Sequence, residues 1–136
     1  MAIELLTICA WQRGGLDRIE VSNPTWGQVS KSIRELDGQS RNDLYLIPNV
    51  ANVETWLAVG GGNGRYLVTG SINNDRFPTV VRLPESDGLD EQLLVGGQVG
   101  DYPKHWILDL DTAIIAAQSF YQTSEFGGGG LHWIDA

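Results

Sequence analysis

The chain has 136 residues, the usual length of one domain, so we expect a single domain over residues 1–136. Hydrophobic residues make up 42% of it and charged residues 19%. This excludes wholesale disorder, because burial of so much apolar surface can offset the conformational entropy lost on folding. Acidic residues outnumber basic ones by 17 to 9, and the net charge of -8 argues against direct binding of nucleic acid over a large surface.

The amino-terminal segment predicts a β-hairpin. Residues 3–11 favour a strand, Gly14-Gly15 interrupts it, and a shorter strand follows at residues 18–21. Cys9 is the only cysteine, which excludes an intrachain disulfide, and its apolar surroundings predict a buried thiol in a reducing compartment. The sequence has no signal peptide and no apolar run long enough for a membrane span, so we expect a cytoplasmic protein.

A helix should follow the hairpin and begin at Trp26. Thr25 can cap it, and Gln28, three positions later, completes a capping box. Apolar residues then recur at spacings of three and four, which predicts one buried helical face, and Gly38 should end the helix. The residues of this face are Trp26, Val29, Ile33 and Leu36.

The middle of the chain reads as a series of strands with short connections. The turn signals between them are too short to hold crossover helices, which predicts an antiparallel meander with one open face. The glycine run 60–64 contains Asn63-Gly64, a pair that favours a tight hairpin turn. A phosphate-binding loop is disfavoured there because a strand, not a helix, follows it. The predicted strands are 43–47, 54–59, 65–72, 77–83 and 92–95.

The carboxy-terminal third predicts a strand, a helix and a short terminal strand. The strand is expected at residues 106–108, and either Asp109 or Asp111 can cap a helix over residues 112–122. The glycines 127–130 should end that helix before a strand or docked tail at 131–134. Together the elements predict an α+β fold, a mostly antiparallel sheet of about six to seven strands with two helices on one face.

The residue types that carry catalysis or bind metals are sparse and scattered. His105 and His132 are far apart in the sequence, and Cys9 stands alone, so no metal-ligand spacing is present. Asp101, Asp109 and Asp111 lack the further oxygen ligands and the glycine of a calcium loop, and helix capping explains the latter two. We therefore expect no metal, no cofactor and no catalytic centre.

Two features point instead to binding of another macromolecule. The segment 85–91 carries four carboxylates and reads as an exposed loop, where opposite charge on a partner would accelerate encounter. The alternative is a loop that is merely solvated, just as the overall acidity alone is also explained by solubility. Trp133, placed after four glycines, is the tryptophan most suited to act as an exposed anchor, with docking of the tail as its alternative. The four carboxylates are Glu85, Asp87, Asp90 and Glu91.

The carboxy-terminal third also resembles a known family, the bacterial deaminase-toxin immunity proteins, the first-numbered immunity family of the polymorphic toxin systems. The resemblance lies in the Gly-rich, Tyr-Pro segment 96–103, the strand expected at residues 106–108, an acidic-capped helix that ends in an aromatic residue, and the closing Trp133. It implies a cytoplasmic antidote that binds a secreted nucleic-acid deaminase and blocks its active site.

The resemblance gives the charge a specific partner. A deaminase that acts on nucleic acid needs a positive substrate surface, which an acidic protein can cover by mimicking phosphate. Two other classes stay open: a small-ligand binder or hydrolase that uses the open sheet face with His105 or His132, and a structural or oligomeric module. The candidate toxin-binding residues are Glu85, Asp87, Asp90, Glu91, Asp101, Tyr102 and Trp133.

Overall fold

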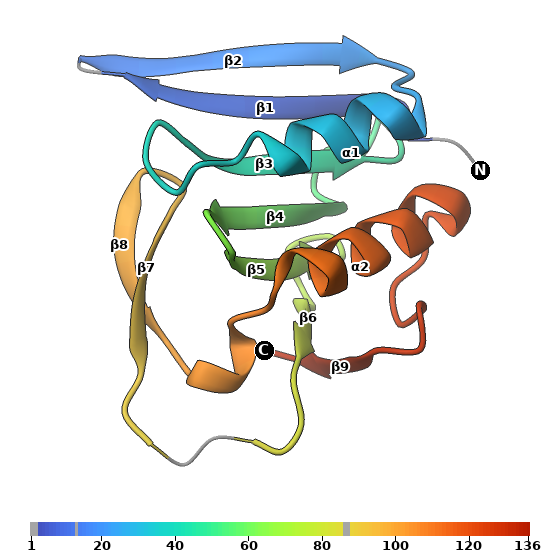
Figure 1. The fold of residues 1–136 in the computed structure, drawn as a ribbon. Helices are drawn as coiled ribbons and strands as arrows, with labels where there is room; N and C mark the ends of the chain where they lie inside the picture. The colour runs from blue at the N-terminus through green and yellow to red at the C-terminus, as the bar shows by residue number, and fades with distance from the viewer. Residues whose placement is uncertain (1–2, 13, 86–87) are drawn as a thin grey trace.

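The computed structural model describes residues 3–12, 14–85 and 88–136 and has an α+β architecture (Figure 1). Its centre is a seven-stranded sheet in the order β2-β1-β3-β4-β5-β6-β9, and all of its strand pairs are antiparallel. The predicted fold class is therefore confirmed. These strands are β1 (Leu5–Gln12), β2 (Gly15–Ser22), β3 (Arg41–Ile47), β4 (Trp56–Gly62), β5 (Arg65–Ser71), β6 (Pro78–Val81) and β9 (His132–Asp135).

Both helices cover the same face of this sheet (Figure 1). Alternate residues of the strands point toward them, as the period of two in a strand requires. Helix α1 (Trp26–Arg34) buries Val29 and Ile33, and helix α2 (Leu110–Thr123) buries Phe120 and three alanines. The strand residues that complete this core include Leu6, Leu44, Leu46, Leu57, Val59, Val68 and Val80, each 0% exposed.

The predicted start of α1 is confirmed, together with its capping box. Thr25 Oγ1 accepts a hydrogen bond from the Gln28 backbone N–H at 3.1 Å, and Gln28 Oε1 accepts one from the Thr25 N–H at 2.9 Å. The helix ends at Arg34, with Glu35 as its C-cap, so it stops before Gly38. Leu36 is nevertheless buried, because the chain beyond the helix still packs on the core.

The meander of β3, β4, β5 and β6 is also confirmed, since each of these strands pairs with the next. The hairpin turn between β4 and β5 uses Asn63 and Gly64, whose φ angles are +55° and +87°. The rest of the glycine run was wrongly expected in the turn: Gly60 to Gly62 belong to β4. A Cβ atom on Gly60 would lie 2.5 Å from Val95, so glycine lets another strand approach here.

That strand belongs to a second sheet, the hairpin of β7 (Glu91–Val95) and β8 (Gln98–Tyr102). Strand β8 was missed, because its glycines and its Tyr-Pro end do not resemble a strand. The strand expected at residues 106–108 is wrong. Residues Lys104–Trp106 form a 3-10 turn, η1, after Pro103, and only Leu108 makes a bridge, to Tyr66 of β5.

Helix α2 and the tail follow the prediction with one correction. Asp109 is the N-cap and accepts a hydrogen bond from the Thr112 N–H at 2.8 Å, whereas Asp111 lies in the first turn. The helix ends at Thr123, and Ser124 adopts a left-handed conformation with φ +56°. The glycines 127–130 therefore do not end the helix; they form the connection to β9, which pairs with β6.

Candidate functional site

The sheet face opposite the helices is covered over only part of its width. The β7–β8 hairpin packs over β4 and β5, where Leu93 and Ile107 bury Leu67 in a second, smaller core. Tyr102 and Trp106 pack against the same cluster. No helix or strand within residues 3–12, 14–85 and 88–136 covers the part of this face formed by β2, β1 and β3 (Figure 1).

A groove of about 470 Å³ lies on that uncovered part, and we call it the sheet-face groove. Alternate residues of β1 and β3 line its floor, because they point away from the helices. Three aromatic side chains form much of its wall, and polar side chains of β1, β2 and β3 also line it. The aromatic residues are Trp11, Tyr45 and Trp56, and the polar ones include Cys9, Arg18, Glu20 and Asp43.

Asp43 is the polar centre of the groove. Its side chain is 2% exposed, and its Oδ1 accepts a hydrogen bond from the Trp11 Nε1–H at 2.8 Å. Burial, together with the charge and a hydrogen bond of Asp43, raises the pKa of the neighbouring Cys9 thiol to about 11. Burial and Asp43 raise the pKa of Tyr45 in the same way. Both groups are therefore neutral at physiological pH, and Cys9 is no nucleophile there.

The Gly96-Gly97 turn of the β7–β8 hairpin closes one end of the groove. Gly97 has φ +76°, and a Cβ atom there would lie 2.6 Å from the Trp11 ring. Its N–H also donates to Oδ1 of the buried Asn42 at 3.0 Å. Gly97 is thus required by its close approach to Trp11 as well as by its positive φ, whereas Gly96, with φ +61°, is required by the turn alone. Two of the glycines that carry the family resemblance therefore have structural roles.

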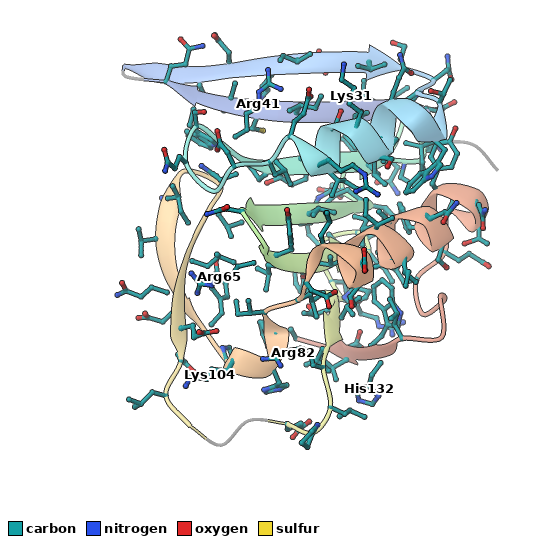
Figure 2. All side chains as sticks on the ribbon, viewed as in Figure 1. Lys31, Arg41, Arg65, Arg82, Lys104 and His132 are labelled. Atoms are coloured by element: carbon teal, nitrogen blue, oxygen red, sulfur yellow. The ribbon has the colours of Figure 1, made fainter. Side chains whose placement is uncertain are left out.

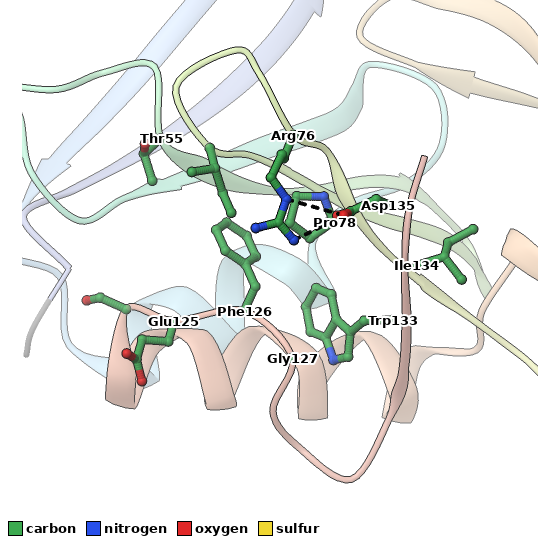
Figure 3. Close-up of a pocket in the computed structure, with 11 residues that line it drawn as sticks. Thr55, Arg76, Pro78, Glu125, Phe126, Gly127, Trp133, Ile134 and Asp135 are labelled. Atoms are coloured by element: carbon green, nitrogen blue, oxygen red, sulfur yellow. Dashed lines mark hydrogen bonds and ion pairs between the residues drawn. The ribbon is translucent and has the colours of Figure 1, made fainter.

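A second cavity, of about 490 Å³, lies at the other end of the main sheet and contains the predicted anchor Trp133 (Figure 3). Trp133 is half-buried in β9, and its Nε1–H donates to the Gly128 carbonyl at 3.0 Å. Its ring meets Phe126 edge-on at 6.1 Å between centroids. Beside it, Arg76 and Asp135 form an ion pair at 3.0 Å. Trp133 is therefore docked into the fold, and only part of its ring faces the cavity.

The acidic candidates lie around the β7–β8 hairpin, except for Asp87, which lies outside the described residues. Glu85 and Asp90 are exposed. Glu91 is half-buried, lies 4.0 Å from the Arg65 guanidinium, and pairs across the hairpin with Tyr102. Asp101, one position earlier, is exposed on the other face of the hairpin. The hairpin thus brings Glu91 and Tyr102 together on one face and places Asp101 on the other, whereas Trp133 lies on a distant strand.

This side of the molecule is not uniformly acidic. Arg65, Arg82 and Lys104 also lie near the hairpin and the η1 turn (Figure 2). Arg82 Nη2 donates to the Lys104 carbonyl at 2.7 Å, which ties β6 to η1. The charge of Glu91 is therefore partly balanced by Arg65, whereas Asp101 forms no ion pair within the described part of the chain.

The histidines do not line the sheet-face groove: His105 lies in η1 and His132 in β9. Among the described residues, no three His, Cys, Asp or Glu side chains lie close enough together to hold a metal ion. Within the same part of the chain, no helix is long and apolar enough to cross a membrane.

The sequence-based reasoning missed the groove, although a signal was present. In β1 and β3 polar residues alternate with buried leucine and isoleucine, as in Thr7 and Cys9 or Asp43 and Tyr45. That period of two marks a second, more polar face of the sheet.

Comparisons of the chain with family models and with curated proteins returned no match.

Proposed function

We propose that the protein is an immunity protein that binds a basic bacterial toxin, a nucleic-acid deaminase, and neutralises it by covering the active site. The observation that carries this proposal is the large excess of carboxylates without a basic partner. All acidic residues except Asp87 are described, and only Glu35, Glu91 and Asp135 among them take part in an ion pair. The remaining charge produces a negative field that attracts a basic surface.

The residues behind the family resemblance support the proposal in a second way. Segment 96–103 builds the turn and outer strand of the β7–β8 hairpin, and it borders the sheet-face groove through Gly96 and Gly97. Asp101 is exposed on this hairpin. We therefore propose the hairpin and the groove beside it as the surface that meets the toxin, with no chemical step performed by this chain.

The test uses the purified protein and the toxin encoded by the neighbouring gene. We expect a complex on size exclusion, and deamination of single-stranded nucleic acid should fall as the protein is added. Binding should weaken with rising salt, because charge attraction between exposed groups is screened. Absence of a complex together with undiminished deamination would sink the proposal.

A matched pair of variants tests the contact surface. Asp101→Lys reverses an exposed charge on the hairpin, and Asp75→Lys makes the same change in the exposed turn between β5 and β6. We expect the first to weaken toxin binding roughly tenfold, mainly through slower association, and the second to change it little. Equal binding by both variants would place the contact elsewhere on the molecule.

A further inference from the structure

Strand β2 is an edge of the main sheet, and its outer side is unpaired. Among the described residues it pairs only with β1, and no helix or loop of this part of the chain covers it (Figure 1). Eight residues, Gly15–Ser22, are extended along this edge without a proline. A regular edge of this length offers a row of free N–H and C=O groups to another strand.

The direction of those free groups follows from the hydrogen bonds of β1. The Trp11 N–H donates to the Ser40 carbonyl, on the β3 side of β1. The backbone N–H and C=O groups of successive strand residues point to alternate sides. Those of the adjacent residue Ala10 therefore point to β2, where its partner is Asp17. On β2 the alternation continues, so the backbone groups of Arg18 and Glu20 point to the free edge.

The side chains along this edge are complementary to a second copy of themselves. If two β2 strands pair antiparallel with Ile19 opposite Ile19, Arg18 of each copy lies opposite Glu20 of the other. Arg18 and Glu20 are both exposed, and neither belongs to an ion pair within the described ranges. Ile19, on the opposite face, is 41% exposed, so pairing would bury an apolar side chain as well.

We infer that β2 is a self-association edge, through which two copies pair antiparallel and join their seven-stranded sheets into one continuous sheet. Charges that merely protect an edge do so by repelling an incoming strand. Here the opposite signs at positions 18 and 20 attract an identical strand in this register instead. An interface confined to one strand edge is small, so the dimer should form in a concentration-dependent equilibrium.

Sedimentation equilibrium of the full chain over a range of concentrations tests the inference. Arg18→Glu and Glu20→Arg each place like charges opposite one another twice, and we expect each to weaken association roughly 10- to 100-fold. The double variant restores both opposite-charge pairs and should associate like the wild type. Lys104→Glu makes the same charge change as Arg18→Glu on the distant η1 turn and should leave association unchanged (Figure 2).

The decisive sample is an equimolar mixture of the two single variants. Each should associate only weakly alone, but in a mixed pair every Glu lies opposite an Arg, so a heterodimer should form. Circular dichroism checks that both variants are folded, and amide exchange at Arg18 and Glu20 should slow as the protein concentration rises. A wild type that stays monomeric at all soluble concentrations, or a mixture that stays monomeric, overturns the inference. The inference is also overturned if Lys104→Glu weakens association as much as Arg18→Glu does, because that result would indicate a general charge effect.

Discussion

The two faces of the main sheet are built from the same strands but have different chemistry. Toward the helices, Leu6 and Leu44 are fully buried among apolar side chains. On the opposite face, Cys9 and Asp43 of the same two strands are buried as well, but around a hydrogen-bonded carboxyl group beside a groove. One face therefore supplies most of the hydrophobic stabilisation, whereas the other holds polar groups that suit recognition.

The largest effect should come from the helix-covered face. Phe120 of α2 is 0% exposed, and Phe120→Ala should lower the free energy of unfolding by about 3–5 kcal/mol because it leaves a large cavity. Ile115→Ala, on the same helix but 44% exposed, serves as the control and should change it by less than about 1 kcal/mol. Urea denaturation measures both. Similar losses in the two variants would contradict the assignment of the main core to this face.

A smaller effect is expected on the groove face, at the contact between Gly97 and Trp11. Gly97→Ala combines an unfavourable φ with a clash against the indole ring, and should cost about 2–4 kcal/mol in the free energy of unfolding. Gly64→Ala has a similar φ, +87°, but no atom within 4 Å of the new Cβ, so it should cost only about 1–2 kcal/mol. The difference between the two losses in the free energy of unfolding measures the contribution of the clash with Trp11.

Urea denaturation gives that difference, and tryptophan fluorescence gives an independent measurement. Displacement of the Trp11 ring in Gly97→Ala should alter the emission, since its Nε1–H would shift from Asp43. Gly64→Ala should leave the emission as in the wild type. Equal losses of stability with unchanged emission would mean that the hairpin turn does not depend on Trp11.

The fold was predictable where local chemistry determined it. Thr25 and Gln28 predicted the start of α1, and Asn63-Gly64 predicted a turn, because capping and positive φ angles depend on residues close in sequence. The errors arose where distant contacts decide. Gly60 belongs to a strand because Val95, far along the chain, packs against it, and no local signal reports that contact.

The candidate site was less predictable for a related reason. Composition suggested an acidic loop and Trp133, but charge and aromaticity alone do not say which side chains face outward. Glu91 lies beside Arg65, and Trp133 donates a hydrogen bond to the Gly128 carbonyl, so both side chains make contacts within the fold. The groove joins residues from β1, β2, β3 and β4, and the strand order that brings these together was not part of the prediction.

The smallest expected effect is a pH dependence that comes from the groove face alone. Burial and Asp43 raise the pKa of Cys9 from 9.0 to about 11, so above pH 9 the unfolded chain binds fewer protons than the folded one. The free energy of unfolding should therefore fall as pH rises through this window, by about 1 kcal/mol between pH 9 and 10 for this thiol. Tyr45, whose pKa is raised for the same reasons, adds to the fall above its ordinary value of 10.0.

Denaturant titrations across this pH range measure the slope, and Cys9→Ala isolates the thiol. In this variant the free energy of unfolding should fall less steeply with pH, and the fall that is left comes from Tyr45. Because only slopes are compared, the constant loss of stability from removing the side chain does not affect the result. Alkylation of the native protein by iodoacetamide should rise with a midpoint near 11, and Asp43→Asn should lower it while burial keeps it above 9.0. An alkylation midpoint near pH 9.0 in the native protein would mean that Cys9 is open to water. The groove face would then not be a packed polar surface, and the proposed contrast with the helix-covered face would be wrong.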